Sequence, residues 1–443
     1  MLPQVLRLGP SAVPLLESVL RGPSGAIHHA RCLAADGLGA IRAPSATEAL
    51  IRALRDSVAR ELDPVSLEAE CVVVNCIAEH LSHRPGSDVT QALVEALSVR
   101  AYPLCALALA QRRDLRAISL LTKCLNDDTA RSAALYALRC YGRAACPALI
   151  GLLLDGQYSD GTEAPSQIDG RVAAARLLGE LAHAGPAPAG ALFALRAALN
   201  DPQRPVRIEA ALSLSRQDGE LLQAPAAVLT EALDEPNWAR AQAIMQTLLH
   251  IGPSAGLIVS KAIAAPAQDE QARRRRLRAV IIAGDLRLSS AVPLLASLSY
   301  VTDRQLRLAA VTALAQVPEA GKRSLERFLF DREGSVRLRA LEGLHERGAL
   351  DPSRLAILLG DSDRTVRRAA EQFLSEQGSS ALDPLKRIVC SFGSPLQGLR
   401  HRARLWWYAC LWLVASRHGT LHPAVAARIP ASSSSTGMPK IRR

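Results

Sequence analysis

One helical phrase, written three times at a fixed interval, constrains the fold of this chain more than any other feature. The copies are LRLAAVTAL from Leu306, VRLRALEGL from Val336 and VRRAAEQFL from Val366. In each copy an Arg is followed by an Ala three positions later and by a Leu seven positions later. A period near thirty that keeps apolar residues at helical spacing predicts a stacked two-helix repeat.

The same phrase recurs along most of the chain. Its Arg stands at positions 31, 131, 171, 207 and 400, and a weaker copy begins at Arg240. A second apolar helical run precedes most copies, as in AVPLLESVL from Ala12 and AVPLLASL from Ala291. We count about twelve helix–turn–helix units, which start near Ser11, Ala46, Asp88, Arg116, Pro147, Gly190, Pro225, Gly256, Ala291, Lys322, Arg354 and Pro384. The pattern is least regular over 46–115 and 256–290.

An all-α fold follows from the repeats and agrees with the composition. Aromatic residues make up only 3% of the chain, and the dominant Ala and Leu suit close packing of helix on helix. Each unit of a repeat array packs only on its neighbours. We therefore expect one long domain over 1–429 rather than several globular domains.

The turns between paired helices carry an Asp six residues before the Arg. The pairs are Asp201 with Arg207, Asp331 with Arg337, and Asp361 with Arg367. An Asp near a helix N-terminus can cap exposed amides, and an Arg on the following helix can reach a neighbouring turn. These residues are predicted to form a structural ladder along the stack.

The turn Asp, the Val-Arg opening of the second helix, its Ala, and a Pro-Leu-Leu element in the first helix resemble HEAT repeats. The Pro-Leu-Leu element stands at Pro14–Leu16 and Pro293–Leu295. The resemblance covers roughly residues 11 to 415 and is nearest to the short bacterial variety, including the phycobilin-lyase-like group. It implies a right-handed α-solenoid that serves as a binding surface or scaffold. No chromophore-handling residue matches a family motif, so the lyase chemistry is not carried over.

Residues 155–170, DGQYSDGTEAPSQIDG, form a predicted insertion between the two helices of the fifth unit. Long insertions in a solenoid project from one edge and often contact partners. A surface loop without such a role is the other interpretation. Its acidic residues lack the ordered spacing of a calcium-binding loop.

Charge is distributed unevenly along the chain. Residues 256–443 hold 30 basic and 16 acidic residues, which leaves 23 and 26 of the totals of 53 and 42 for residues 1–255. The basic part contains Arg273 to Arg276, Arg278, Arg339, Arg368 and Arg402. A basic stripe can meet an acidic protein, nucleic acid or an anionic membrane. Solvated faces and structural pairing explain the same arginines in an Arg-rich chain, and the scarcity of aromatics disfavours base stacking.

A hydrophobic helix is predicted near the C-terminus, over 398–419. Its uninterrupted apolar stretch, Leu405 to Ala415, is shorter than the roughly twenty residues that a membrane span needs. It either closes the solenoid or presents Trp406, Trp407 and Trp412 to a protein partner or a membrane interface. Residues 430–443 are predicted to be a disordered basic tail.

We found no catalytic, cofactor or metal site in the sequence. There is no GxGxxG, GxxxxGK[ST], HExxH or GxSxG motif. His80 and His83, beside Glu79, could share one metal ion, but no third ligand stands at a convincing spacing; His28 and His29 are adjacent and cannot share a helical face.

The compartment that the sequence favours is a bacterial-type cytoplasm. The nine cysteines include no Cys-x-x-Cys pair and lie mostly among helical apolar residues, which favours reduced thiols. The first residues, which contain Arg7 within an apolar run, do not form a secretion signal.

The sequence therefore favours a non-catalytic scaffold or adaptor that binds a protein partner, with an acidic protein among the candidates. The first alternative is a nucleic-acid-binding solenoid that uses the basic C-terminal half, and the second is a phycobilin-lyase-like enzyme subunit. Arg339, Arg368, Arg402, Trp406, Trp407 and Trp412 are the predicted partner-binding residues.

Overall fold

The computed structural model of this chain divides into two compact units, residues 1–229 and residues 230–443, which we call unit 1 and unit 2. The sequence predicted one continuous domain over 1–429. The structure describes residues 8–23, 28–155, 163–185, 188, 190–216, 222–318, 320–377 and 381–390.

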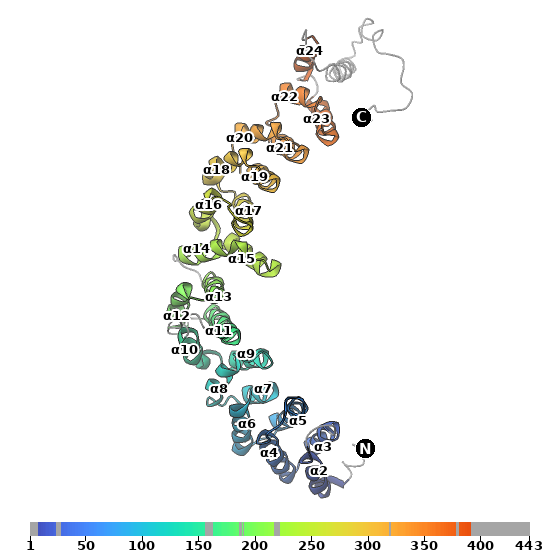
Figure 1. The fold of residues 1–443 in the computed structure, drawn as a ribbon, viewed down its shortest axis with the longest axis vertical. Coiled ribbons are helices and arrows are strands. Elements are labelled where there is room, and N and C mark those ends of the chain that lie inside the picture. Colours follow the sequence, from blue (N-terminus) through green and yellow to red (C-terminus); the bar gives the residue numbers. More distant parts are fainter. Residues whose placement is uncertain are drawn as a thin grey trace, which may run out of the picture. The chain divides into compact units, whose positions relative to one another are not determined.

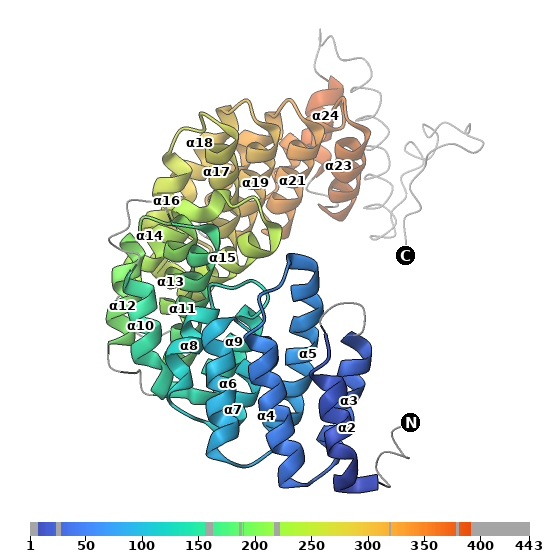
Figure 2. The same ribbon diagram turned by 60° about the horizontal axis from the view of Figure 1, so that its bottom comes forward.

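Within these described residues the secondary structure is entirely helical, and the helices alternate in two rows (Figures 1 and 2). The first helices of the repeats are α2 (Val13–Leu20), α4 (Pro44–Val58), α6 (Ser87–Val99), α8 (Ala117–Cys124), α10 (Cys146–Asp155), α12 (Ala191–Ala197), α14 (Gln223–Glu231), α16 (Gly256–Ala264), α18 (Val292–Ser297), α20 (Lys322–Glu326), α22 (Pro352–Leu358) and α24 (Leu382–Cys390). The predicted α-solenoid of about twelve repeats is confirmed.

The second helices form the other row in each unit, on the right-hand side of Figure 1. They are α3 (His28–Ala40), α5 (Pro64–Ser82), α7 (Pro103–Arg112), α9 (Arg131–Tyr141), α11 (Pro165–His183), α13 (Arg204–Leu214), α15 (Trp238–Ile251), α17 (Glu270–Asp285), α19 (Arg304–Gln316), α21 (Gly334–Glu346) and α23 (Arg364–Gln377). Short 3-10 segments end several first helices, among them η8 (Leu298–Tyr300) and η9 (Arg327–Phe330).

Small side chains allow neighbouring second helices to pack closely. Ala310 and Leu314, the Ala and Leu of one copy of the phrase, are both fully buried. Gly284 of α17 shows the limit of this packing, because a Cβ at this position would lie 2.7 Å from the Cα of Ala313 in α19. A backbone atom cannot move aside as a flexible side chain can, so the contact requires glycine.

In unit 2, Arg307 and Arg337 each connect their own repeat to the next. The Nη1 of Arg337 donates to the main-chain carbonyl oxygen of Asp331 in its own repeat at 2.6 Å. Its Nε and Nη2 donate to the two carboxylate oxygens of Asp361 in the next repeat at 2.8 and 2.6 Å. Arg307 binds two carbonyl oxygens of its own turn and the carboxylate of Asp331 in the same way.

The turn carboxylates have a second role, which differs from the capping that the sequence suggested. Asp361 accepts a hydrogen bond from the amide of Asp363 at 2.7 Å, and Asp331 accepts one from the amide of Glu333 at 2.9 Å. The donor is two residues after the Asp, so the side chain closes an Asx turn. Glu333, rather than Asp331, is the N-cap residue of α21.

The other predicted ladder residues make only some of these contacts. Arg367 donates to two carbonyl oxygens of its own turn, at 2.7 and 2.9 Å, and Arg207 does the same at the same two distances. Asp201 accepts a hydrogen bond from Arg171 of the preceding repeat, which also pairs with Glu163 at 2.7 Å. In unit 1, Arg171 reaches Asp201 of the next repeat, and the Nη1 of Arg131 lies 3.5 Å from the carboxylate of Asp169 on α11.

The predicted insertion over 155–170 is shorter than expected. Helix α11 begins at Pro165, where the ring presets the backbone of the first helical turn, and Gln167 accepts a hydrogen bond from the amide of Ala164. Residues 163 and 164 therefore directly precede the helix, and residues 165–170 belong to it. The rest of the insertion, 156–162, lies outside the described residues, as do the predicted helix over 398–419 and the tail over 430–443.

Two segments are long and apolar enough to cross a membrane by length and composition, Arg131–Asp155 and Trp238–Ala264. Each is a second helix followed by the next first helix. A 3-10 segment separates the two, and it begins at Gly142 in one case and at Gly252 in the other. Both glycines have positive φ, 58° and 71°, so the chain turns at these points.

Candidate functional site

The predicted partner-binding residues fall into two groups. Arg339 on α21 is partly buried, and its Nη1 lies 3.1 Å from the carboxylate of Glu346 and 3.5 Å from that of Glu342 on the same helix. Arg368 on α23 is exposed. Arg402, Trp406, Trp407 and Trp412 lie outside the described residues.

The arginine run on α17 is largely committed to contacts within unit 2. Arg273 donates to the Asp303 carboxylate, which holds the pKa of that carboxyl below its usual range. The remaining contacts of the run are Arg274 with Glu270, Arg275 with Asp234, Arg276 with the carbonyl of Ile263, and Arg278 with the carbonyls of Leu233 and Glu235. These guanidinium groups anchor α17, so the run is not a free phosphate-binding stripe.

Aromatic side chains lie on the surface more often than in the core. Nine aromatic residues belong to the described part of the chain. Four are buried: Tyr102, Tyr141, Phe328 and Phe373. Five are exposed: Tyr136, Phe193, Trp238, Tyr300 and Phe330. The core is built from Ala, Leu and other aliphatic residues, so packing does not explain why the exposed aromatic residues are there.

Two of these residues occupy equivalent positions in adjacent repeats of unit 2. Tyr300 and Phe330 end the 3-10 segments η8 and η9 and are 81% and 67% exposed. Two residues earlier, Leu298 and Phe328 point into the core and are 1% and 0% exposed. A 3-10 turn has about three residues, so side chains two apart cannot share its inner face.

One arginine lies over the Phe330 ring, and two more contact the turns that follow Tyr300 and Phe330. The guanidinium carbon of Arg354 lies 5.9 Å from the centroid of the Phe330 ring. Arg332, exposed on the next turn, donates to the carbonyl of Thr302 at 2.6 Å. Arg304 is also exposed, with its Nε 3.7 Å from the Glu333 carboxylate. We call Tyr300, Phe330, Arg304, Arg332 and Arg354 the aromatic edge.

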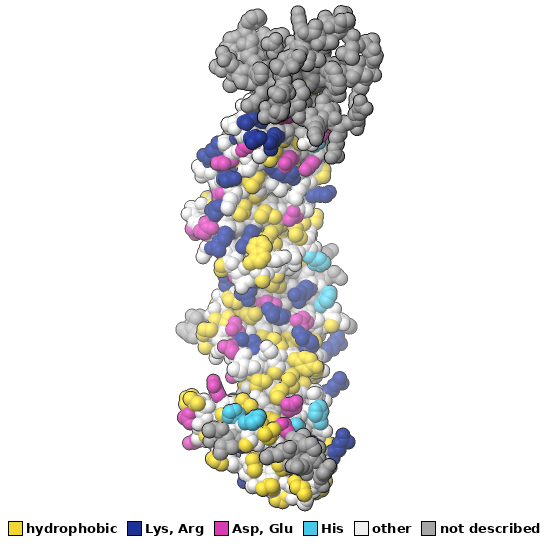
Figure 3. All heavy atoms as spheres, turned by 90° about the vertical axis from the view of Figure 1, so that its right-hand side faces the viewer, with side chains coloured by type: hydrophobic (Ala, Val, Ile, Leu, Met, Phe, Trp, Pro, Cys, Tyr) yellow, Lys and Arg dark blue, Asp and Glu magenta, His cyan; other side chains and the backbone are white. Residues whose placement is uncertain are grey.

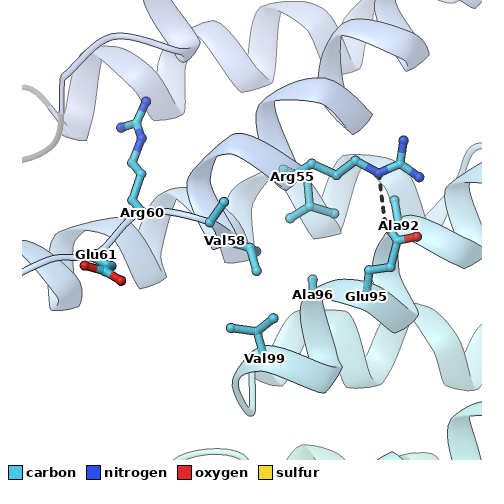
Figure 4. A pocket seen from close by; sticks show the side chains of 10 residues that line it. Arg55, Val58, Arg60, Glu61, Ala92, Glu95, Ala96 and Val99 are labelled. Atoms are coloured by element: carbon cyan, nitrogen blue, oxygen red, sulfur yellow. Dashed lines mark hydrogen bonds and ion pairs between the residues drawn. The ribbon is translucent and has the colours of Figure 1, made fainter.

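A cavity of about 450 Å³ lies in unit 1 between α4 and α6 (Figure 4). Leu54, Val58, Ala96 and Val99 supply apolar walls. The polar groups of its lining include Glu95, whose pKa is lowered by the hydrogen bond from Gln91 at 3.1 Å and by that from the Nε of Arg55 at 2.9 Å. Its volume is in the range of small-ligand sites.

His80 has metal-ligating neighbours, but His83 is not one of them. Within the described residues, the donor atoms of Asp36, Cys76 and His80 all lie within 4.8 Å of one another. Burial, followed by the nearby Asp36 carboxylate, raises the pKa of the Cys76 thiol. Sequence reasoning missed this group because Asp36 is on α3, more than forty residues before His80 on α5. The four-residue spacing of Cys76 and His80, which places both on one face of a helix, was the feature of the sequence that could have indicated this group.

The side of the second helices carries charges of both signs (Figure 3). Several of them pair between neighbouring helices. In unit 1, Arg139 of α9 pairs with Glu180 of α11 at 2.6 Å. In unit 2, His345 of α21 lies 3.2 Å from Glu376 of α23 and stacks on Phe373. Paired charges suit a face that meets a protein better than one that must neutralise a row of phosphates.

No protein-family model and no curated protein matches this sequence. Solved structures to which the chain is similar include one of Kap95p with RanGDP, at 14% identity over 92% of this chain and 65% of the other, with a TM-score of 0.47. The chain thus spans less than two thirds of that protein. A structure of the Pds5–Scc1 complex matches at 11% identity over 92% and 75%, with a TM-score of 0.36.

Human deoxyhypusine hydroxylase matches at 20% identity over 77% of this chain and 97% of the other, with a TM-score of 0.24. The architecture is established by the chain's own features: a row of first helices, a row of second helices and, in unit 2, two arginines that each join one turn to the next. The described part of the chain is an α-solenoid of two-helix repeats.

Proposed function

We propose that this chain is a non-catalytic scaffold that binds a partner protein, with the aromatic edge of unit 2 as a principal contact. The exposure of five of the nine described aromatic side chains carries this proposal. Tyr, Trp and Arg are enriched among the residues that contribute most to protein interfaces, because they bury large areas while keeping polar or charged groups. Tyr300 and Phe330 meet this description together with three arginines.

The charge of the aromatic edge favours an acidic partner segment. Arg354 lies over the Phe330 ring and pairs with Glu326 at 3.1 Å, Arg304 lies 3.7 Å from Glu333, and Arg332 donates to the carbonyl of Thr302, so three arginines and two acidic side chains meet at the edge. An acidic segment with an apolar anchor would bury the rings and pair with the arginines at the rim. Nucleic acid is the alternative partner, supported by the basic excess of residues 256–443.

We place the scaffold in the cytoplasm. Cys105, Cys124 and Cys146 are buried free thiols, and burial raises the pKa of Cys124 to about 11. Thiols of this kind persist in a reducing compartment, where they behave as small apolar core residues.

The test compares two surface variants of the full chain. The double variant Tyr300→Ser, Phe330→Ser removes both rings of the aromatic edge. Phe193→Ser removes a similarly exposed ring from unit 1. Proteins captured from the native cell after nuclease treatment are identified, and the affinity of each purified candidate is then measured. We expect the edge variant to weaken a true partner by at least about 30-fold, since a hot-spot truncation costs about 2 kcal/mol or more.

Phe193→Ser should leave that affinity unchanged. A partner that binds both variants as well as wild type would contradict the role of the edge. Recovery of nucleic acid alone, with an affinity that falls steeply with salt, would replace the protein-binding function by the alternative.

A further inference from the structure

Helices α3 and α5 of unit 1 each present two metal-ligating side chains at a spacing of four residues. Cys32 and Asp36 lie on α3, and Cys76 and His80 lie on α5. Side chains four apart share one face of a helix. The two helices pack against each other, so the two pairs meet between neighbouring repeats. We call these four residues the α3–α5 cluster.

The donor atoms converge. The Nε2 of His80 lies 2.8 Å from the Oδ1 of Asp36, and the Sγ of Cys76 lies 3.5 Å from the same oxygen. The Cys76 thiol also donates to the main-chain carbonyl oxygen of Cys32 at 3.7 Å, while the sulfur of Cys32 lies outside the group of three donor atoms that are all within 4.8 Å of one another. In a tetrahedral zinc site, bonds of about 2.3 Å to sulfur and 2.0 Å to oxygen place these two ligands about 3.5 Å apart. The sulfur–oxygen distance in the protein already has this value.

The backbone of α3 is shaped to receive the imidazole. A Cβ on Gly39 would lie 2.3 Å from the Nδ1 of His80, so only a glycine leaves room for the ring against the helix. Arg84, just beyond the end of α5, donates to the carbonyl oxygens of Leu38, Gly39 and Ile41 at 3.1, 2.8 and 2.6 Å. These contacts fix the C-terminal end of α3 beside His80.

We propose that Asp36, Cys76 and His80 bind one Zn²⁺ ion that fastens the second helix of the first repeat to that of the second. Thiolate, imidazole and carboxylate are all ligands that zinc takes in four-coordinate sites. The three protein ligands come from both helices and leave the fourth position to water, so the bound ion cross-links α3 to α5. The carboxylate and imidazole are 42% and 25% exposed, which gives the ion a path from solvent.

The role in the array follows from the position of the cluster. Elsewhere on the same helix pair, Arg31 of α3 and Glu70 of α5 form a buried ion pair with distances of 2.6 and 2.7 Å. The zinc ion would add a second cross-link between α3 and α5. In an array where each repeat packs only on its neighbours, such a link stabilises the end of unit 1 against fraying.

The experiment uses the full chain, kept reduced by a phosphine, stripped with a chelator and titrated with Zn²⁺ or Co²⁺ alone. We expect one ion per chain and, with Co²⁺, the visible spectrum of a tetrahedral site with thiolate charge-transfer absorption. Asp36→Asn and Cys76→Ser should weaken binding by more than about 100-fold, because even outer-shell partners contribute 10–100-fold. Circular dichroism checks that each variant folds.

Two variants serve as controls. His83→Gln removes the histidine at the end of α5, and Cys140→Ser removes an exposed thiol of α9; both should bind Zn²⁺ as wild type does. Zn²⁺ should slow hydrogen exchange in α3 and α5 but not in α9. Failure of the folded wild type to bind one Zn²⁺, a Co²⁺ spectrum without thiolate absorption, or unchanged affinity in Asp36→Asn would overturn the proposal.

Discussion

Arg31 in unit 1 and Arg337 in unit 2 join neighbouring repeats with the same chemistry but draw the carboxylate from different places. In unit 2 Arg337 binds a carbonyl of its own turn and the carboxylate of Asp361 in the next turn. In unit 1 Arg31 binds the carbonyl of Leu20, at the end of its own first helix, at 2.8 Å, together with the carboxylate of Glu70. Glu70 lies inside helix α5 rather than in a turn.

The two ion pairs also differ in burial, which determines how much stability is lost when one member of the pair is removed. Arg31 and Glu70 are 1% and 2% exposed, and the hydroxyl of Ser57 also accepts from Arg31 at 3.0 Å. Arg337 and Asp361 are 9% and 6% exposed at their side chains, at the margin of the stack. Burial removes water as a substitute partner, so losing one member of a deeply buried pair costs more than losing one at the margin.

The largest effect is therefore expected from Glu70→Ala in unit 1. The variant leaves the Arg31 guanidinium buried without its carboxylate, which costs about 3–5 kcal/mol. Native-state hydrogen exchange of the full chain should show the loss in α3 and α5. Adding Arg31→Met removes the stranded charge and should restore part of the stability; a double variant no more stable than Glu70→Ala would contradict this account.

In unit 2, Arg337→Met should destabilise the array more than Arg367→Met does. The first substitution strands the Asp361 carboxylate, at about 2–3 kcal/mol, whereas the second removes hydrogen bonds to two carbonyls of its own turn, at about 1 kcal/mol. Denaturant unfolding of the full chain measures both. Equal losses would mean that the ion pair to the next repeat contributes nothing beyond the contacts within the turn.

A smaller, pH-dependent effect is expected at Asp303, whose pKa is lowered chiefly by the hydrogen bond from Arg273. A carboxyl with a lowered folded-state pKa contributes stability that is present above its ordinary pKa of about 3.9 and is lost as the pH falls through the folded value. The stability difference between wild type and Asp303→Asn should therefore shrink below about pH 4. Asn keeps the N-cap acceptor of α19.

Asp285→Asn, an exposed acid at the end of α17, is the matched control for that titration. Its difference from wild type should be small and should not follow the Asp303 profile. Hydrogen exchange in α17 and α19 at pH 7 and at pH 3 provides the measurement, and a constant difference for Asp303→Asn across this range would refute the link to Arg273.

Much of the fold could be predicted because the repeat is a local pattern. The start predicted near Lys322 is the first residue of α20. The start predicted near Gly190 lies one residue before Ala191, the first residue of α12. Spacing along one helix determines which side chains face the neighbour, and the sequence shows that spacing directly. The end of the insertion was harder, because Pro165 marks a helix start only once the chain after it is known to be helical.

The site residues were harder to predict than the fold. The acid partner of Arg31 is thirty-nine residues away on another helix, so no offset within one repeat could reveal Glu70. The sequence also treated the arginines of α17 as a group, while the structure shows that Arg276 and Arg278 reach carbonyls of different segments. A run of charged residues has the same sequence pattern whether its side chains face solvent or make contacts within the protein.

By itself, the sequence determined the helical repeat, its period and the positions that face the core, because all of these depend on residues within about one repeat of each other. The tertiary structure decided what each polar residue meets across the stack. It placed Asp36 beside Cys76 and His80, and it brought Tyr300 and Phe330 to one exposed edge. Contacts between helices depend on how the repeats are stacked, and no fixed spacing of residues along the chain encodes that geometry.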